Sequence, residues 1–445
     1  MGLSTFKGGI HPYEGKELSM DQPVTELMEP AGDLVYPVSQ HIGAPAKPVV
    51  APGDHVLVGQ RIAEAGGFIS AHVNSSVSGT VKALEKRLMV NGSRVLSIIV
   101  ENDGRYDAVP GMGEHRDPSS LSKQEIRDIV KDAGIVGMGG AGFPTNVKLT
   151  PKDENAIDYC IVNGSECEPY LTSDYRMMLE RPDEIVGGLK IMLQLFDHAK
   201  GVIGIEDNKP QAIKVMQERV KNEPRISVQV LKTKYPQGGE RSMIYAITGR
   251  KVNSSMLPAD AGCIVDNVDT VISIYRAIAE KTPLIERIIT VTGDAIKKPC
   301  NFRVRTGTAY QELIDAAGGF KEEPEKILSG GPMMGQAIFS LDIPVTKTSS
   351  TLTCFIKDEI AREPETPCIR CGRCVSVCPE NLVPQMMMDA CEQRDVDEFE
   401  KLNGMECIEC GCCSFICPAR RPLTQSFKEM KREVGAKRKK EAAKK

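Results

Sequence analysis

The chain has 445 residues, 41% hydrophobic and 26% charged, which is room for three or four ordinary globular domains. Its 15 cysteines show no disulfide framework, which favours a reducing compartment and argues against a secreted fold. We expect no signal peptide, because the N-terminus lacks an apolar region, and no membrane-spanning segment, because no stretch of about eighteen residues is free enough of charge. Any membrane association is therefore expected to be peripheral.

Short strands separated by turns are predicted between residues 45 and 101. Apolar residues alternate around Gly-Asp and Ser-Gly turns, which favours a small all-β sandwich. The pattern resembles the biotinyl/lipoyl barrel-sandwich family, but no lysine lies between Lys47 and Lys82 to serve as that family's carrier residue. We therefore expect a scaffold domain. Three histidines without spaced partners are predicted to be surface residues: His41, His55 and His72.

Helix and strand patterns alternate from about residue 120, which predicts a layered α/β domain. Ser122 and Glu125 form a capping box for a helix that ends before Gly134. Further predicted elements are strands at 158–162, 201–205 and 226–231 and helices at 185–196, 210–221 and 270–280. A strand at 288–292 and a helix at 310–317 then indicate a compact α+β module.

A glycine-rich loop lies between the first helix and the first strand of the α/β domain. Such a loop lets backbone N–H groups approach a phosphate or a flat ring, since no Cβ intervenes. Phe143 offers a ring that can stack, and Lys148 a cation that can reach a phosphate. A flexible turn is the alternative interpretation, because the strand-first order of the dinucleotide fingerprint is missing. The loop residues are Gly137, Gly139, Gly140, Ala141 and Gly142.

Two copies of one cysteine pattern lie near the C-terminal end. Each copy has three cysteines at CxxCxxC spacing and a fourth followed by proline, as in bacterial proteins with two [4Fe–4S] clusters, where the fourth cysteine binds the other copy's cluster. Zinc is the alternative, but it favours paired CxxC motifs with a longer insert. Cys412, beside Cys413, leaves one ligand open. The expected sets are Cys368, Cys371, Cys374 and Cys417, and Cys407, Cys410, Cys413 and Cys378.

The C-terminal residues are basic. Residues 428–445 hold nine basic and three acidic side chains, so this tail carries +6 and the remainder −10. A solvated helix end is one interpretation; the other is attraction to anionic headgroups or an acidic partner, at ~1 kcal/mol per basic residue. No nucleic-acid binding is expected, because Phe427 is the one aromatic residue near the tail.

Four segments, in the same order, resemble the flavoprotein subunit of respiratory complex I. They are residues 137–148, 163–169, 235–240 and 265–270. In that family these segments surround FMN, and NADH stacks on the flavin ring. Ser165 and Gly239 depart from the family's usual aspartate and glutamate. The resemblance implies FMN contacts from Lys148, Asn163, Glu166, Tyr235, Gly238, Asn267 and Thr270, and nucleotide contacts from Phe143, Glu168 and Glu240.

Nearly the whole chain resembles the C subunits of the Rnf electron-transport complexes. Residues 6–12 (Phe-Lys-Gly-Gly-Ile-His-Pro) and 407–413 (Cys-Ile-Glu-Cys-Gly-Cys-Cys) carry the resemblance. It implies a multidomain α/β and α+β fold: an N-terminal barrel-sandwich hybrid, a complex I flavoprotein-like FMN/NAD domain, an SLBB β-grasp module and a helical two-cluster ferredoxin-like segment. The expected boundaries are 1–115, 116–285, 286–350 and 351–430, with a basic tail at 431–445.

This family implies an NADH-dependent oxidoreductase subunit, peripheral on the cytoplasmic side of the cell membrane, that passes electrons between NAD(H), FMN and two [4Fe–4S] clusters. Its expected partners are the ferredoxin-like B subunit, the membrane subunits and, through the complex, ferredoxin, with Na+ or H+ translocation. No side chain is expected to be a proton-transfer catalyst, because the cofactors carry the hydride chemistry. The alternatives are a soluble cobalamin reductase of a microcompartment and a scaffold that relays electrons without binding nucleotide.

Overall fold

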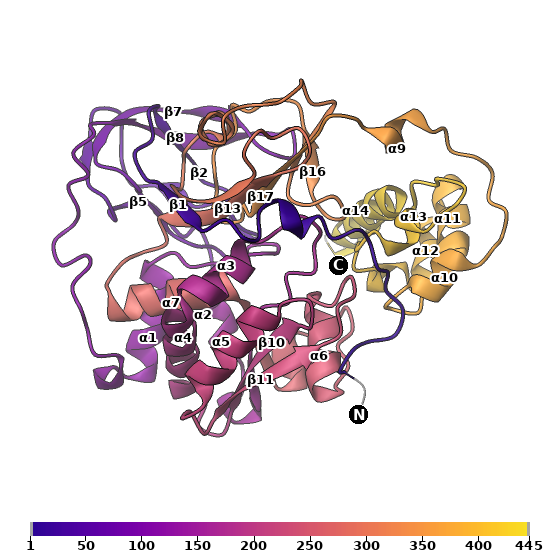
Figure 1. Ribbon diagram of the computed structural model, residues 1–445, viewed down its shortest axis with the longest axis horizontal. Helices are drawn as coiled ribbons and strands as arrows, with labels where there is room; N and C mark the ends of the chain where they lie inside the picture. The colour runs from indigo at the N-terminus through magenta and orange to yellow at the C-terminus, as the bar shows by residue number, and fades with distance from the viewer. Residues whose placement is uncertain (1–2, 443–445) are drawn as a thin grey trace.

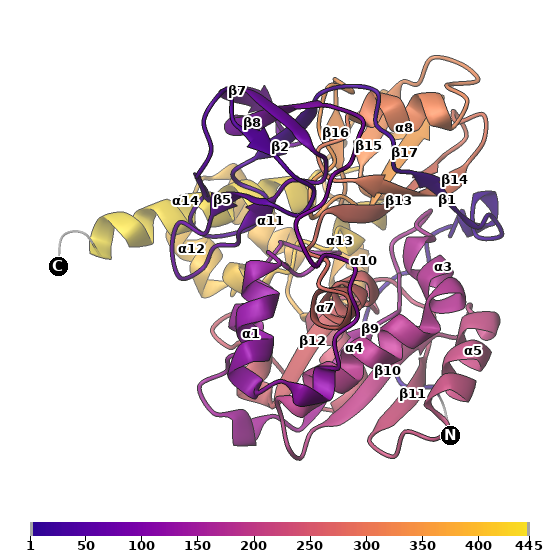
Figure 2. The same ribbon diagram turned by 90° about the vertical axis from the view of Figure 1, so that its left-hand side faces the viewer.

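The computed structural model describes residues 3–442, which form four packed parts (Figure 1). An α/β domain occupies one side of the molecule. Two β-rich modules lie opposite it, and a cysteine-rich helical part stands at one end. Figure 2, turned by 90°, shows the final helix extending away from the rest. Within residues 3–442, no helix is both long and apolar enough to cross a bilayer.

The α/β domain is built on a sheet of four parallel strands in the order β11-β10-β9-β12. The strands are β9 (Tyr159–Asn163), β10 (Lys200–Glu206), β11 (Ile226–Leu231) and β12 (Cys263–Asn267). The helices are α1 (Lys123–Asp132), α2 (Thr145–Lys148), α3 (Ser173–Glu180), α4 (Pro182–Gln194), α5 (Pro210–Val220), α6 (Glu240–Thr248) and α7 (Val268–Ala279). Asn163 and Asn267 pair where β9 and β12 end, so the segments that follow both strands start at one edge of the sheet.

The capping box predicted for the first helix of this domain is present. The Ser122 side chain accepts from Glu125 N, and the Glu125 carboxylate accepts from Ser122 N at 2.8 Å, which closes the capping box of α1. Gly134 ends the helix in the left-handed region, at φ 66°. Pro210 begins α5, as its fixed φ favours. The buried stripe of α1 holds Ile126 and Val130, which join the core beneath the sheet.

The barrel-sandwich module consists of two antiparallel sheets, in the orders β2-β8-β7-β4 and β3-β5-β6. Its strands are β2 (Leu34–Pro37), β3 (Lys47–Pro48), β4 (His55–Val56), β5 (Arg61–Glu64), β6 (Val73–Asn74), β7 (Gly79–Leu88) and β8 (Arg94–Asn102). The prediction that His41 and His72 are surface residues is wrong, because both are buried. Each ring accepts a backbone N–H, from Ala71 at 3.1 Å and Ala65 at 3.0 Å respectively, which offsets its burial. His55 is exposed, as expected.

The second β-rich module is a six-stranded sheet with the order β1-β14-β13-β17-β15-β16, packed on α8 (Tyr310–Ala316). The strands are β1 (Val24–Leu27), β13 (Glu286–Thr292), β14 (Cys300–Arg305), β15 (Lys326–Ser329), β16 (Gln336–Ile338) and β17 (Thr351–Phe355). The sheet extends beyond the predicted module at 286–350. β17 lies in its middle, and β1 from the N-terminal segment adds an edge strand. Such long-range pairing leaves no local pattern in the sequence.

The cysteine-rich part is helical, as expected. A linker with α9 (Glu359–Arg362) leads to α10 (Arg373–Val377), α11 (Pro384–Glu392), α12 (Val396–Lys401), α13 (Cys412–Phe415) and α14 (Leu423–Ala442). The repeated motif gives a repeated turn, because α10 and α13 each follow a glycine with positive φ, Gly372 at 74° and Gly411 at 85°. The basic tail belongs to α14 up to residue 442, and its side chains bridge to this part's carboxylates: Lys431 to Glu409, Lys437 to Asp397 and Arg438 to Glu400.

Candidate functional site

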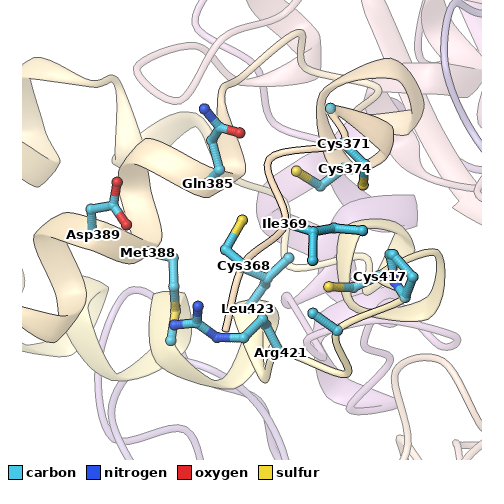
Figure 3. A pocket seen from close by; sticks show the side chains of 13 residues that line it. Cys368, Ile369, Cys371, Cys374, Gln385, Met388, Asp389, Cys417, Arg421 and Leu423 are labelled. Atoms are coloured by element: carbon cyan, nitrogen blue, oxygen red, sulfur yellow. The ribbon is translucent and has the colours of Figure 1, made fainter. Parts of the chain in front are cut away.

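Thiols from both cysteine motifs line one cavity, which we call the outer cluster cavity (Figure 3). Cys368, Cys371 and Cys374 come from the first motif and Cys417 from the second. Gln385 and Met388 of α11, among others, complete the lining. Cys368 and Cys371 are exposed, so this cavity lies at the molecular surface. The structure therefore brings together the set that the spacing predicts, while cluster ligation by these thiols stays a prediction.

The other thiols line a second cavity, which we call the inner cluster cavity. It combines Cys378 of the first motif with Cys407, Cys410, Cys412 and Cys413 of the second. Backbone N–H groups point at the sulfurs, as in cluster-binding loops: Leu382 N lies 3.4 Å from Cys378 Sγ and Glu409 N lies 3.4 Å from Cys407 Sγ. Cys410 and Cys413 are buried, in contrast to the exposed thiols of the outer cavity.

The inner thiols are suited to a metal cluster rather than to free-thiol chemistry. Burial raises the pKa of Cys407 to about 12 and that of Cys413 to about 12, so both are neutral when nothing binds them. Iron would supply the positive charge that their thiolate forms need, with release of protons on binding. Two sets of four thiols are the donor count that two cubanes require.

Cys412 and Cys413 face different neighbours. The Cys413 sulfur lies 3.7 Å from Thr424 Oγ1, under α14. Cys412 packs in an apolar group with Ile10 and Tyr235, and its sulfur lies 3.9 Å from the Tyr235 carbonyl oxygen. Cys412 thus faces the α/β domain, whereas Cys413 stands at the third cysteine position of the CxxCxxC repeat. We therefore retain Cys413 as the predicted ligand.

The glycine-rich loop lies at the N-terminus of α7. Met138 N donates to Thr270 Oγ1 at 2.9 Å, and a Cβ on Gly139 would lie 3.4 Å from the Asn267 amide nitrogen. A Cβ on Gly140 would meet no atom of the described chain within 4 Å, so this part of the loop is open. Asn267 caps α7 by accepting from Asp269 N at 2.9 Å. The loop and the positive end of the helix dipole together suit an anionic group.

Lys148, at the end of α2, faces β12 and α6. Its Nζ donates to the Val265 carbonyl at 2.7 Å and lies 3.2 Å from the Asp266 carboxylate and 3.8 Å from that of Glu240. Burial opposes its charge, but these two carboxylates outweigh it and raise the pKa of Lys148. The structure thus brings together Lys148 and Glu240, and it adds Asp266. Phe143, half-buried, accepts from Gly137 N at 2.8 Å through its carbonyl oxygen.

Asn163 joins two of the predicted flavin segments. Its side-chain amide donates to the Gly238 carbonyl at 2.7 Å and accepts from Ser165 N at 3.2 Å. Glu166 turns inward beneath this loop. It accepts from Asp174 N at 2.7 Å and lies 3.8 Å from Lys16 Nζ of the N-terminal segment.

Glu168 and Tyr235 lie at the junction between domains. The Glu168 carboxylate accepts from Met333 N at 2.6 Å and Met334 N at 3.1 Å, in the SLBB-type loop at 330–335. The Tyr235 hydroxyl donates to the Cys410 carbonyl at 2.7 Å. The expectation from the resemblance was nucleotide contact for Glu168 and flavin contact for Tyr235. In the structure both side chains also connect the α/β domain to its neighbours.

Several polar atoms at these loops are buried without a partner among the described residues. Among residues 3–442, no hydrogen-bond partner is present for Ser165 Oγ, the Gln237 side-chain amide or Asp266 Oδ2. Unpaired buried polar groups are costly, so a bound group with both donors and acceptors would stabilise them. The pyrimidine edge of a flavin offers both kinds of group. These residues therefore fit FMN.

The sequence did not indicate the contacts that dock the cysteine-rich part. Arg241 of α6 lies 3.0 Å from Glu380 and 3.0 Å from Glu406, one near each cysteine motif. Lys16 and the 330–335 loop were likewise not singled out. Arg241 directly follows the predicted flavin segment at 235–240, and this was the available signal, but its partners lie more than a hundred residues away.

Four family models match successive parts of the chain. Residues 4–105 match the RnfC barrel-sandwich hybrid domain, 130–276 the Nuo51 FMN-binding domain, 288–337 the SLBB domain and 359–418 the 4Fe-4S dicluster domain. The fold is also similar to that of a solved chain from an NAD+-reducing [NiFe]-hydrogenase, at 18% identity and TM-score 0.52 over 71% of this chain and 64% of that one. The predicted fold class and the predicted FMN, NAD(H) and [4Fe–4S] cofactors are confirmed; the individual contacts stay predictions.

Relatives of known name match from end to end. The chain is 45% identical to the C subunit of the Na+-translocating ferredoxin:NAD+ oxidoreductase complex of Acetobacterium woodii, over 98% of both chains. It is also 45% identical to the C subunit of the proton-translocating complex of Clostridium ljungdahlii, over 99% of this chain and 96% of that one. The chain belongs to the RnfC family, the C subunits of ion-translocating ferredoxin:NAD+ oxidoreductase complexes.

Proposed function

We propose that this chain is the peripheral subunit through which electrons enter or leave a membrane-bound ferredoxin:NAD+ oxidoreductase complex. It passes electrons between NAD(H), FMN and two [4Fe–4S] clusters. One observation carries the proposal: the Tyr235 hydroxyl donates to the Cys410 carbonyl at 2.7 Å. This bond joins a flavin-binding segment directly to a cluster motif within one polypeptide.

The flavin loops hold and orient the cofactor. FMN, when bound, accepts a hydride and releases electrons singly. Thr270 fixes the glycine-rich loop, and Lys148 supplies positive charge beside it. With the cofactors in place, oxidation of one NADH to NAD+ would release one proton and two electrons, and the thiols of the two cavities would hold the clusters that take up one electron each. We assign the cofactor contacts to Gly137, Gly139, Gly140, Ala141, Gly142, Phe143, Lys148, Asn163, Glu166, Glu168, Tyr235, Gly238, Glu240, Asn267 and Thr270.

The two cluster cavities have different places in this path. The inner cavity adjoins Tyr235 and is buried against the α/β domain. The outer cavity presents Cys368 and Cys371 at the surface. The inner cavity therefore suits exchange with the flavin, and the outer cavity suits exchange with a partner protein. The proposed ligand sets are Cys378, Cys407, Cys410 and Cys413 inside, and Cys368, Cys371, Cys374 and Cys417 outside.

The proposed partners are the ferredoxin-like B subunit and the membrane subunits of the complex, and ferredoxin through them. The relatives support this, since they are named as subunits of translocating complexes. We place the chain on the cytoplasmic side of the cell membrane, held there through its partners. The chain is equally identical to a relative from a Na+-translocating complex and to one from a proton-translocating complex, so we propose no coupling ion.

Anaerobic purification followed by cofactor analysis tests the proposal. We expect about eight irons and one FMN per chain, because two cubanes hold four irons each. NADH added to this protein should bleach the flavin absorbance. A preparation that holds zinc in place of iron, or flavin that NADH does not reduce, would contradict the proposed function.

A further inference from the structure

The proposed function assigns no role to the N-terminal segment at residues 6–16, which we call the strap. It holds the Phe-Lys-Gly-Gly-Ile-His-Pro stretch. In Figure 1 the indigo trace runs from beside α6, past α10, to the upper β-rich module. Isolated bridges at Ser4 and Ile10 join this region to Leu231 of β11 and to Tyr235.

The strap is bonded to the flavin-binding segment that contains Tyr235. Ile10 N donates to the Tyr235 carbonyl, and Tyr235 N donates to the Ile10 carbonyl, each at 2.9 Å. Lys234 Nζ donates to the Phe6 carbonyl at 2.6 Å and lies 4.1 Å from the centre of the Phe6 ring. Phe6 and Ile10 are both buried. The strap is therefore fixed on this loop by backbone pairing and by side-chain packing.

The same segment is bonded to the inner cluster cavity. Gly9 N donates to the Val377 carbonyl at 2.8 Å, one residue before the predicted ligand Cys378. Gly8 and Gly9 have φ of 80° and 81°. A Cβ on Gly8 would lie 2.8 Å from the Cys378 carbonyl oxygen and 2.9 Å from that of Val377. Two consecutive glycines thus allow the strap to touch the backbone at a cluster ligand.

The far end of the strap reaches the loop that holds Glu166 and Glu168. Lys16 is buried, and its ammonium donates to the Glu168 carbonyl at 3.2 Å and the Leu171 carbonyl at 2.6 Å. The Glu166 carboxylate lies 3.8 Å away. A buried ammonium is costly unless it is bonded and paired in this way, so the contact is well defined.

We infer that the strap is a positioning element for electron transfer, which fixes the flavin loops and the inner cluster cavity at one separation. This inference rests on the proposed function. Gly8 and Gly9 are positioning residues that act through the Val377–Cys378 backbone. Ile10 packs in one apolar group with Tyr235, Cys410 and Cys412.

Anaerobic stopped-flow kinetics of the full holoprotein tests the inference in Gly8→Ala. NADH should reduce the flavin at the wild-type rate, but the later reduction of the clusters should slow. Because the rate of electron transfer falls steeply as the distance between donor and acceptor grows, we expect the rate of cluster reduction to fall severalfold. Gly92→Ala is the matched control, because Gly92 has φ 76° and a Cβ there would meet no described atom within 4 Å. It should slow neither phase.

Two further measurements keep the test decisive if Gly8→Ala does not fold. Ile10→Ala introduces no backbone strain and should slow the same phase. In the wild-type holoprotein, amide exchange of Gly9 and Ile10 should be as slow as that of Tyr235. Wild-type cluster reduction in both variants with full FMN and iron, or rapid exchange of the two strap amides, would overturn the inference. Failure of the proposed function is distinct, since the wild-type flavin would then not respond to NADH.

Discussion

The inner and outer cluster cavities come from one repeated motif but have different surroundings. The outer cavity has exposed thiols at Cys368 and Cys371. The inner cavity is covered by the α/β domain, by the strap and by the 330–335 loop. Burial raises the pKa of Cys407 to about 12, whereas the outer cavity opens to water. The motif repeat sets where the thiols are, and the neighbouring domains set how each cavity can exchange electrons.

The largest expected effect comes from the ligands that cross between motifs. Cys378→Ala should remove the inner cluster and leave the outer one, and Cys417→Ala should do the reverse, because each fourth cysteine is predicted to bind the cluster of the other motif. Iron content should fall from about eight to about four per chain in either variant. If spectra show that Cys378→Ala loses the outer cluster and Cys417→Ala loses the inner one, this pairing is contradicted.

A second substitution distinguishes the flavin site from the two cluster cavities. Lys148→Ala removes a charge at the glycine-rich loop and should weaken FMN binding. Hydrogen bonds to charged groups contribute roughly 1.5–3 kcal/mol, so we expect Kd to rise about ten- to hundredfold. Fluorescence titration of the flavin-depleted protein measures the change. Unchanged FMN affinity, or loss of iron in the same variant, would show that Lys148 does not serve the flavin.

The contact between the inner cavity and the α/β domain can be weakened without touching a thiol. Arg241→Met removes the bridges to Glu380 and Glu406, although Glu406 still accepts hydrogen bonds from Ser254 N and Ser254 Oγ. We expect a loss of about 2 kcal/mol in the free energy of unfolding of the cysteine-rich part, since these side chains are only partly exposed. Denaturant unfolding followed by cluster absorbance measures it. Arg373→Met, at an exposed site beside Cys374, is the control and should have no such effect.

The smallest effect is expected at Cys412. Cys412→Ala should keep both clusters, since Cys413 occupies the position that the repeat requires. Cys413→Ala should lose the inner cluster. Iron analysis and electron paramagnetic resonance of the two variants compare them directly, and an intact inner cluster in Cys413→Ala would assign the ligand to Cys412.

Patterns within one stretch of sequence predicted much of this molecule. The capping box at Ser122, the proline start of α5 and the CxxCxxC spacing each depend on neighbours within a few residues. The resemblance to the complex I flavoprotein predicted which loops meet at the end of the sheet. Long-range contacts left no such signal. The addition of β1 to the distant sheet and the pairing of Arg241 with Glu406 follow from tertiary packing.

Reduction of the Cys378→Ala protein by NADH tests the central claim most directly. In the proposed path, electrons reach the outer cluster only through the inner one. Under anaerobic conditions NADH should therefore bleach the flavin of this variant while the outer cluster stays oxidised, and Cys417→Ala should still show a reduced inner cluster. Reduction of the outer cluster in Cys378→Ala at the wild-type rate would contradict the account.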